Sequence, residues 1–201
     1  ERKVTIVYSG GDDLFVVGAW NEVIACAIDI HKMLEQFAIG SLHISAGIGV
    51  FHGKYPLSVC AREVDLLEQS AKGFVKGNKQ KNAVCLFDEN NTYDWDTFIR
   101  FVLGEKLQTL DAFLENQEER GMAFLYRLLE LIRHREEKIN LARFAYVLTR
   151  LEPKENKEEY QTFSRKMYQW ACKDEDSQQL ITAIYIYVYL HREEDERHDT
   201  E

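Results

Sequence analysis

The sequence predicts an α+β domain, with helices on one face of a mostly antiparallel sheet, followed by an all-α domain. Two observations divide the chain: nine of its 11 glycines lie before residue 88, and strand-like patterns stop near the same place. The charge changes there as well, because residues 1–88 carry 9 basic and 10 acidic residues, whereas residues 89–201 carry 16 and 24. Such a shift in composition is typical of a domain boundary. We therefore predict a first domain over residues 1–90 and a second over residues 91–201.

The first predicted element is a β-hairpin with two acids at its tip. The segment Tyr8-Ser9-Gly10-Gly11-Asp12-Asp13 lies between the apolar runs 4–7 and 14–17. Glycine supplies the positive φ that a tight turn requires, and it lets a phosphate approach the backbone. Adjacent carboxylates repel one another unless they share a cation, and oxygen ligands suit Mg²⁺ or Mn²⁺. The alternative is an ordinary hairpin turn, since Gly-Asp pairs are common there for backbone reasons alone.

The rest of the first domain alternates helices and strands. Asn21 can cap a helix that ends before Gly40, and residues 42–51 alternate as a strand does, with interior glycines that permit a close neighbour. Pro56 and Ser58 open a second helix, and a short strand follows over residues 83–87. The predicted order is hairpin, helix, strand, helix, strand, which belongs to the mixed α and β class.

The segment from Lys72 to Lys81 is basic and contains four lysines but no acid. Lysines at a helix end can simply balance the helix dipole. Two glycines within the segment favour a second interpretation, in which a tight backbone makes the ammonium groups converge. Converging lysines beside a carboxylate pair are what a triphosphate requires.

The second domain is predicted to be a bundle of about five helices, because apolar residues recur there at three- and four-residue spacing. Asp94 or Asp96 can cap the first helix, which reaches toward Leu114, and Gly121 begins the second. The remaining apolar faces run from Leu141 to Leu151, from Tyr160 to Ala171 and from Leu180 to Leu190. One basic cluster, which could contact RNA phosphates, is interleaved with acids that favour a salt-bridged surface instead; it comprises Arg127, Arg133, His134, Arg135, Lys138 and Arg143.

Composition also limits the setting of the protein. No apolar run approaches the length that crosses a bilayer, so we expect no membrane contact and a cytoplasmic location. The four cysteines lie far apart and are predicted to be free, small core residues. The chain opens on Glu1-Arg2-Lys3 without a methionine, so we expect a piece of a longer protein.

Together these motifs resemble the palm domain of the large subunit of type III CRISPR interference complexes, a relative of nucleotidyl cyclases and polymerases. The signature stands here as Gly10-Gly11-Asp12-Asp13, and it is followed in the expected order by the strand Ser45 to Val50 and the helix Leu66 to Lys72. The resemblance implies a ferredoxin-like palm and a C-terminal helical domain. The chain is thus identified as a C-terminal fragment of such a subunit, with the III-A (Csm) type favoured.

The resemblance implies that the full-length protein converts ATP to cyclic oligoadenylates, as part of an RNA-guided antiviral complex. Asp12 and Asp13 are then the catalytic acids and hold Mg²⁺ or Mn²⁺. The implied nucleotide contacts, in which Lys72 is the best candidate for the triphosphate, are Ser9, Gly10, Gly11, Lys72, Lys79 and Lys81.

The resemblance also implies partners and limits. The helical domain is expected to dock the small helical subunits, beside a guide-binding subunit, and the complex brings guide RNA and target RNA. Palm enzymes of this kind take another acid from a strand before the hairpin, so we expect this chain alone to be inactive or nearly so. Two alternatives remain: a diguanylate cyclase of the bacterial signalling kind, and a non-catalytic platform for protein contacts.

Overall fold

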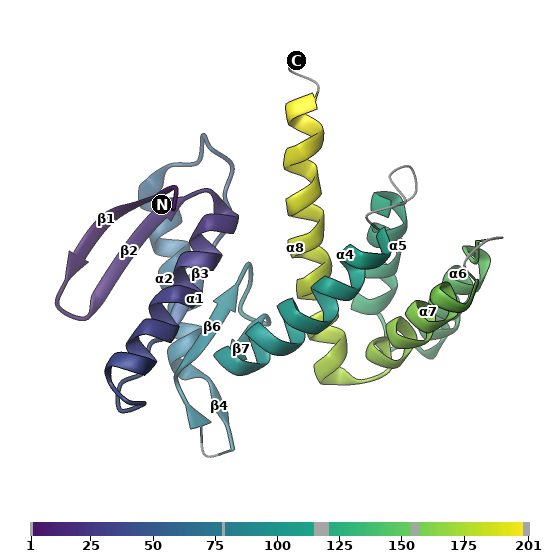
Figure 1. Ribbon diagram of the computed structural model, residues 1–201, viewed down its shortest axis with the longest axis horizontal. Coiled ribbons are helices and arrows are strands. Elements are labelled where there is room, and N and C mark those ends of the chain that lie inside the picture. The colour runs from purple at the N-terminus through teal and green to yellow at the C-terminus, as the bar shows by residue number, and fades with distance from the viewer. Residues whose placement is uncertain (1, 78, 115–120, 154–156, 199–201) are drawn as a thin grey trace. The chain divides into compact units, whose positions relative to one another are not determined.

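The computed structural model describes residues 2–77, 79–114, 121–153 and 157–198, without the side chains of residues 79, 121 and 192–198. The chain divides into two compact units, Glu1–Ile99 and Arg100–Glu201 (Figure 1). The first unit carries the strands, whereas the described part of the second unit is helical.

The predicted hairpin is present. Strands β1 (Val4–Gly10) and β2 (Asp13–Gly18) pair antiparallel, with Gly10 opposite Asp13, and the register shifts between Ile6 and Tyr8. Gly11 occupies the turn with a φ of 63°. This left-handed conformation carries a steric penalty for residues with a Cβ, so the glycine is explained by the turn itself.

Helix α1 (Trp20–Phe37) packs against both strands of the hairpin and against β3. It begins earlier than predicted, because Ala19 is the N-cap residue. The predicted capping role of Asn21 is wrong: its side-chain oxygen accepts a hydrogen bond from the Glu22 backbone N–H at 2.9 Å, inside the first turn. The helix ends before Gly40, as predicted.

The next strand is much shorter than the predicted 42–51, because β3 covers only Ala46–Ile48. The Ile44 carbonyl, just before it, accepts a hydrogen bond from the Trp95 indole at 2.9 Å instead of from a strand. The predicted close neighbour at an interior glycine is confirmed at Gly47, where a Cβ would lie 2.5 Å from the Val64 carbonyl oxygen. Helix α2 (Leu57–Gly73) therefore packs directly on the β3 backbone.

Strand β6 (Ala83–Leu86) is fully buried and pairs parallel with β3. Three further strands were not predicted: β4 (Val75–Lys76) and β5 (Lys79–Gln80) form a small ladder, and β7 (Thr92–Asp94) pairs antiparallel with β6. The strands lie in three separate sheets, in the orders β1-β2, β3-β6-β7 and β4-β5. Among the described residues three of the four strand pairings are antiparallel.

Strand β7 also moves the division of the chain. The boundary between the domains was predicted between residues 90 and 91, but in the structure the first compact unit extends to Ile99. The segment after residue 90 belongs to the first unit because β7 pairs with β6, and because the Trp95 ring stacks on His31 of α1 with centroids 4.7 Å apart.

After β7 all described elements are helical, beginning with α3 (Trp95–Thr97), which Asp94 caps by accepting a hydrogen bond from the Thr97 backbone N–H at 3.1 Å. A π-helix, η1 (Phe98–Leu107), continues it into α4 (Gln108–Leu114). The wider π-helical turn was not predicted. The remaining helices are α5 (Gly121–Arg133), α6 (Lys138–Arg150), α7 (Lys157–Ala171) and α8 (Asp174–His198).

The second unit forms the predicted bundle, and the buried faces of α5 to α8 largely follow the predicted apolar positions. One exception is Tyr168, which is 40% exposed because Phe163, Met167 and Trp170 occupy the buried stripe of α7. The described cysteines are free, as predicted, but Cys172 is exposed and is not a core residue. Within the described residues no helix combines the length and apolar character needed to span a bilayer.

Candidate functional site

The two acids at the hairpin tip lie at the surface of the first unit. Asp12 and Asp13 are exposed, and neither carboxylate forms a hydrogen bond or an ion pair within the described part of the chain. Their oxygen lone pairs are therefore available to a ligand. Both glycines were expected to serve the turn, but of the two only Gly11 has a positive φ. The glycine at position 10 therefore needs another explanation.

Lys72 is the predicted contact that the structure brings near these acids. It lies in the last turn of α2, and its ammonium group forms an ion pair with the Glu68 carboxylate at 2.9 Å. This hydrogen bond is the main cause that raises the pKa of Lys72, and the negative charges of Asp13 and Asp12 raise it further. The carboxylates at the tip and the ammonium group at the end of α2 thus act on one another electrostatically.

Ser9 lies beside the turn, opposite Leu14 in the ladder, and its exposed hydroxyl forms no hydrogen bond within the described residues. Lys79 pairs with Lys76 in the β4–β5 ladder, and its side chain lies outside the described part of the structure. The tip therefore combines two carboxylates, one hydroxyl and one nearby ammonium group, whereas the position of the Lys79 ammonium group is not described.

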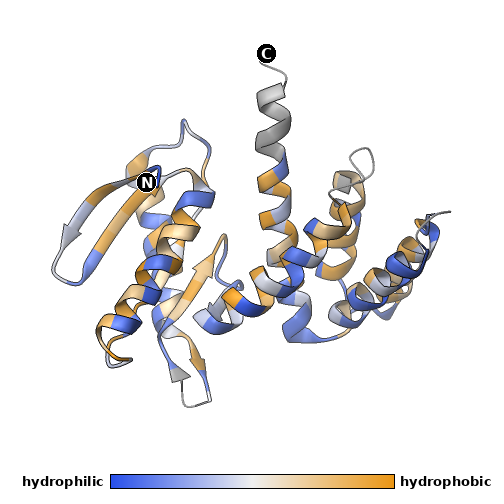
Figure 2. Ribbon diagram, in the orientation of Figure 1, coloured by the Kyte–Doolittle hydropathy of each residue, from blue (hydrophilic) through white to orange (hydrophobic). Residues whose placement is uncertain are grey.

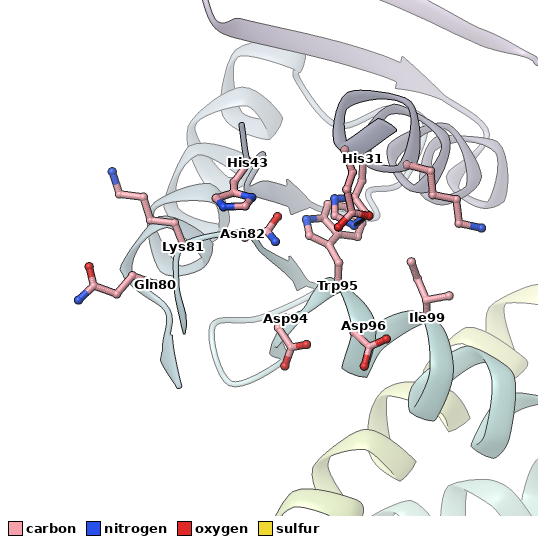
Figure 3. A pocket seen from close by; sticks show the side chains of 11 residues that line it. His31, His43, Gln80, Lys81, Asn82, Asp94, Trp95, Asp96 and Ile99 are labelled. Carbon is pink, nitrogen blue, oxygen red and sulfur yellow. Dashed lines mark ion pairs between the residues drawn. The ribbon is translucent and has the colours of Figure 1, made fainter. Parts of the chain in front are cut away.

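Lys81 belongs to a different place. It has a φ of 58° and lines a cavity of about 680 Å³ whose lining does not include the hairpin acids. Figure 3 shows Lys81 beside this cavity with Asn82 and His43, and the stacked rings of His31 and Trp95 also line it. Burial lowers the pKa of His31, and the nearby charges of Glu35 and His43 act on it in opposite directions. The sequence pattern gave no sign of this cavity, because its residues come from four separate segments.

The chemistry of the tip fits a divalent cation, but incompletely. Paired carboxylates without nitrogen or sulfur ligands suit Mg²⁺ or Mn²⁺. However, the described residues contain no group of three or more His, Cys, Asp or Glu side chains placed to hold a metal ion. The two acids therefore supply part of a metal site, to which a bound nucleotide or further acids would have to add ligands.

The basic cluster of the second unit is partly paired, as the interleaved acids indicated. The Nε2 atom of His134 lies 3.4 Å from Oε1 of Glu130, and Arg135 forms an ion pair with Asp174. Arg143 donates to the Asn140 side chain at 3.3 Å. These contacts favour the interpretation of a salt-bridged helix surface over that of an RNA-binding surface.

Comparison with known families identifies both units. The family model described as the second palm domain of Cas10/Cmr2 matches residues 1–85. The model described as the second helical domain of the Cmr2 subunit of the CRISPR RNA silencing complex matches residues 111–193. The two matches follow one another along the chain in the order that the resemblance predicted.

Individual relatives agree with these matches. Proteins described as CRISPR system single-strand-specific deoxyribonuclease Cas10/Csm1 (subtype III-A) are 44% identical over 195 residues in Mycobacterium tuberculosis and 37% identical over 195 residues in Streptococcus thermophilus. A third, from Enterococcus italicus, is 38% identical over 193 residues. These alignments cover 94–96% of this chain but only 24–25% of each relative, so the chain spans about a quarter of their length. The chain therefore belongs to the Cas10 family of type III CRISPR effector subunits, of which it carries the second palm domain and the second helical domain.

Proposed function

We propose that the first unit supplies part of a nucleotidyl-transfer site, at which the full-length protein converts ATP to cyclic oligoadenylates. The observation that carries this proposal is the hairpin tip, where two exposed carboxylates form no hydrogen bond or ion pair with any described residue and lie within electrostatic reach of Lys72. A palm domain with such a tip can bind a metal–nucleotide complex, whereas an ordinary turn has no need of two unpaired acids.

Each residue of the tip has a separate part in this proposal. Asp12 and Asp13 hold the Mg²⁺ or Mn²⁺ ion, which when bound lowers the pKa of the attacking ribose hydroxyl and neutralises the phosphates. Gly11 forms the turn, and the Ser9 hydroxyl donates a hydrogen bond to a phosphate oxygen. Lys72 exchanges Glu68 for the triphosphate and compensates the charge of the leaving pyrophosphate. Lys79 and Lys81 are weaker candidates, since Lys81 lines a separate cavity.

This site is incomplete on its own. Two carboxylates are fewer ligands than a pair of divalent ions requires, and the described residues add no third. We therefore expect the remaining metal ligand to come from another part of the full-length protein, and this chain alone to be inactive or nearly so.

The second unit is proposed to dock other subunits of the effector complex. Its family model is named for a subunit of a CRISPR RNA silencing complex, which supports contacts with small helical subunits and a guide-binding subunit. Guide RNA and target RNA then reach the protein through the complex, and target binding activates the palm domain. In this proposal the helical unit binds the other subunits, and the palm unit supplies the residues for nucleotidyl transfer.

The experiment uses the full-length protein assembled with guide RNA and target RNA. Incubation with ATP and Mg²⁺ or Mn²⁺, followed by mass analysis, is expected to yield cyclic oligoadenylates. The Asp12→Asn/Asp13→Asn variant should assemble normally but lose the product. A variant that still turns over ATP would show that the tip is not the metal site. The matched control is Asp65→Asn, which removes an acid from an exposed position on α2.

The same assay separates the alternatives. Cyclic dimers of guanylate would favour the diguanylate cyclase, which the family assignment does not support. No product from ATP or GTP would favour the non-catalytic platform. The relatives are named for cleavage of single-stranded DNA, and that activity of the whole protein is tested separately with a labelled DNA strand.

A further inference from the structure

The hairpin carries an aromatic residue on the same face as one of its acids. Residues directly opposite in an antiparallel ladder point their side chains to the same face, as do residues two apart along one strand. Gly10 lies opposite Asp13, and Tyr8 lies opposite Phe15. Tyr8, the position of Gly10, Asp13 and Phe15 therefore share one face of the hairpin.

The Tyr8 ring lies along the strand over Gly10. A Cβ atom built on Gly10 would be 2.5 Å from the Tyr8 hydroxyl oxygen and 2.9 Å from its Cζ atom. The phenol therefore occupies the space of the missing side chain, and its hydroxyl end reaches toward the turn. Since the φ of Gly10 is not positive, this close approach explains the glycine better than backbone conformation does.

The Tyr8 hydroxyl lies at the surface of the hairpin. Tyr8 is 57% exposed, so its ring does not complete a core, and its hydroxyl forms no hydrogen bond within the described residues. A phenol hydroxyl can donate a hydrogen bond, and a donor beside a carboxylate that binds a metal–nucleotide complex faces the oxygens of that nucleotide.

We propose that the Tyr8 hydroxyl donates a hydrogen bond to a phosphate oxygen of the nucleotide held at Asp12 and Asp13, and that position 10 is glycine to leave room for this phenol. The inference rests on the proposed function and adds a binding residue to it. The proposed role can be told apart from a structural one, because removing the Tyr8 hydroxyl alone should weaken nucleotide binding and leave the stability of the fold unchanged.

The test measures binding of a non-hydrolysable ATP analogue with Mn²⁺ to the assembled complex, and then kcat and KM for ATP. Tyr8→Phe keeps the ring and should weaken binding about tenfold, the effect of losing one hydrogen bond to a charged group. Gly10→Ala should cause a similar loss, since its methyl group displaces the phenol. Because both variants remove the same contact, the double variant should be no weaker than either single variant within about twofold.

The control is Tyr126→Phe, which removes a hydroxyl from a 51% exposed tyrosine of α5 and should leave binding unchanged. If the wild type binds the analogue and Tyr8→Phe binds it equally well, the proposed role of Tyr8 is wrong, while the proposed function still stands. Additive losses in the double variant would overturn the explanation of Gly10. A wild-type complex that binds no analogue would overturn the proposed function, and the inference with it.

Discussion

The two units of this chain differ in how completely they bury their apolar residues. In the first unit, α1 buries only Ile24 and His31 among its 18 residues, and the hairpin leaves Ile6 63% exposed. In the second unit, α7 buries five of its 15 residues, from Tyr160 to Ala171. Figure 2 shows that hydrophobic residues continue along β2 of this hairpin. The acids of the candidate site therefore lie on the most exposed part of the first unit, whereas the helices of the second unit share a buried core.

The two units also differ in whether their charged side chains have protein partners. The hairpin acids have no hydrogen-bond or ion-pair partner among the described residues, whereas Lys106 of η1 is fully buried and fully partnered. Its ammonium group donates to Asp176 at 3.0 Å and to Gln179 at 2.8 Å, and it lies 5.0 Å from the centroid of the Trp170 ring. The charge of Lys106 therefore holds η1 against α7 and α8 in the second unit, whereas the charges of the hairpin acids hold no other element of the described chain in place.

The largest expected effect on stability comes from Lys106→Met. The variant leaves the carboxylate and amide partners of Lys106 without their donor, so unfolding should become easier by about 3 kcal/mol. Urea denaturation followed by tryptophan fluorescence measures this change. The control Lys166→Ala alters an exposed lysine of the same unit and should stay within about 0.5 kcal/mol. A loss below about 1 kcal/mol in Lys106→Met would show that the buried network does not stabilise the bundle.

A smaller effect is expected from Lys72→Ala in the first unit. Loss of a charge-assisted phosphate contact should weaken ATP binding by about 1–3 kcal/mol, with little change in stability because Lys72 is exposed. Equilibrium binding of the ATP analogue checks it. Glu68→Gln is the informative companion, since it frees the ammonium group and should tighten binding or leave it unchanged. Unaltered affinity in Lys72→Ala would leave Lys72 as a helix-end lysine paired with Glu68.

A pH dependence should appear in the first unit. Burial lowers the pKa of His31 in the folded protein, so below its ordinary value of 6.5 the unfolded chain binds more protons than the folded one. Stability should therefore rise with pH through this window and be lost on acidification. Urea midpoints at pH 5.5 and 7.5 measure the slope, which His31→Gln should reduce. Equal slopes in both proteins would assign the pH dependence to other groups.

The smallest effect on stability should come from removing both hairpin charges. Asp12→Asn/Asp13→Asn loses only repulsion at an exposed turn, so its free energy of unfolding should match the wild type within about 0.5 kcal/mol. Denaturation measured beside Lys106→Met makes the comparison direct. Marked destabilisation by the asparagines would mean that these acids serve the fold, and would remove the contrast between the units.

Much of the fold could be predicted, because long helices and a hairpin have strong local patterns. The elements that were missed are short or non-local. Strands β4, β5 and β7 have two or three residues each, too few for a visible alternation. The burial of Lys106 depends on Asp176 and Gln179, which lie 70 and 73 residues away in the sequence. Local periodicity carries no information about such partners.

The candidate site shows the same limit. Asp12, Asp13 and Gly11 were predicted from one short motif, and the structure places them together in the turn. That Tyr8 shares a face with Asp13 depends on the register, including its shift between Ile6 and Tyr8, which the sequence pattern did not indicate. The pairing of Lys72 with Glu68 was likewise missed, although a four-residue spacing on a helix permits it.

We propose that the hairpin acids bind a divalent ion together with a nucleotide. Crystals of the full-length protein with Mn²⁺ and a non-hydrolysable ATP analogue test it most directly, through the anomalous scattering of manganese. If these acids hold the ion, an anomalous peak will lie within about 2.5 Å of carboxylate oxygens of Asp12 and Asp13. A manganese peak at another place, with the nucleotide bound away from the hairpin, would contradict it.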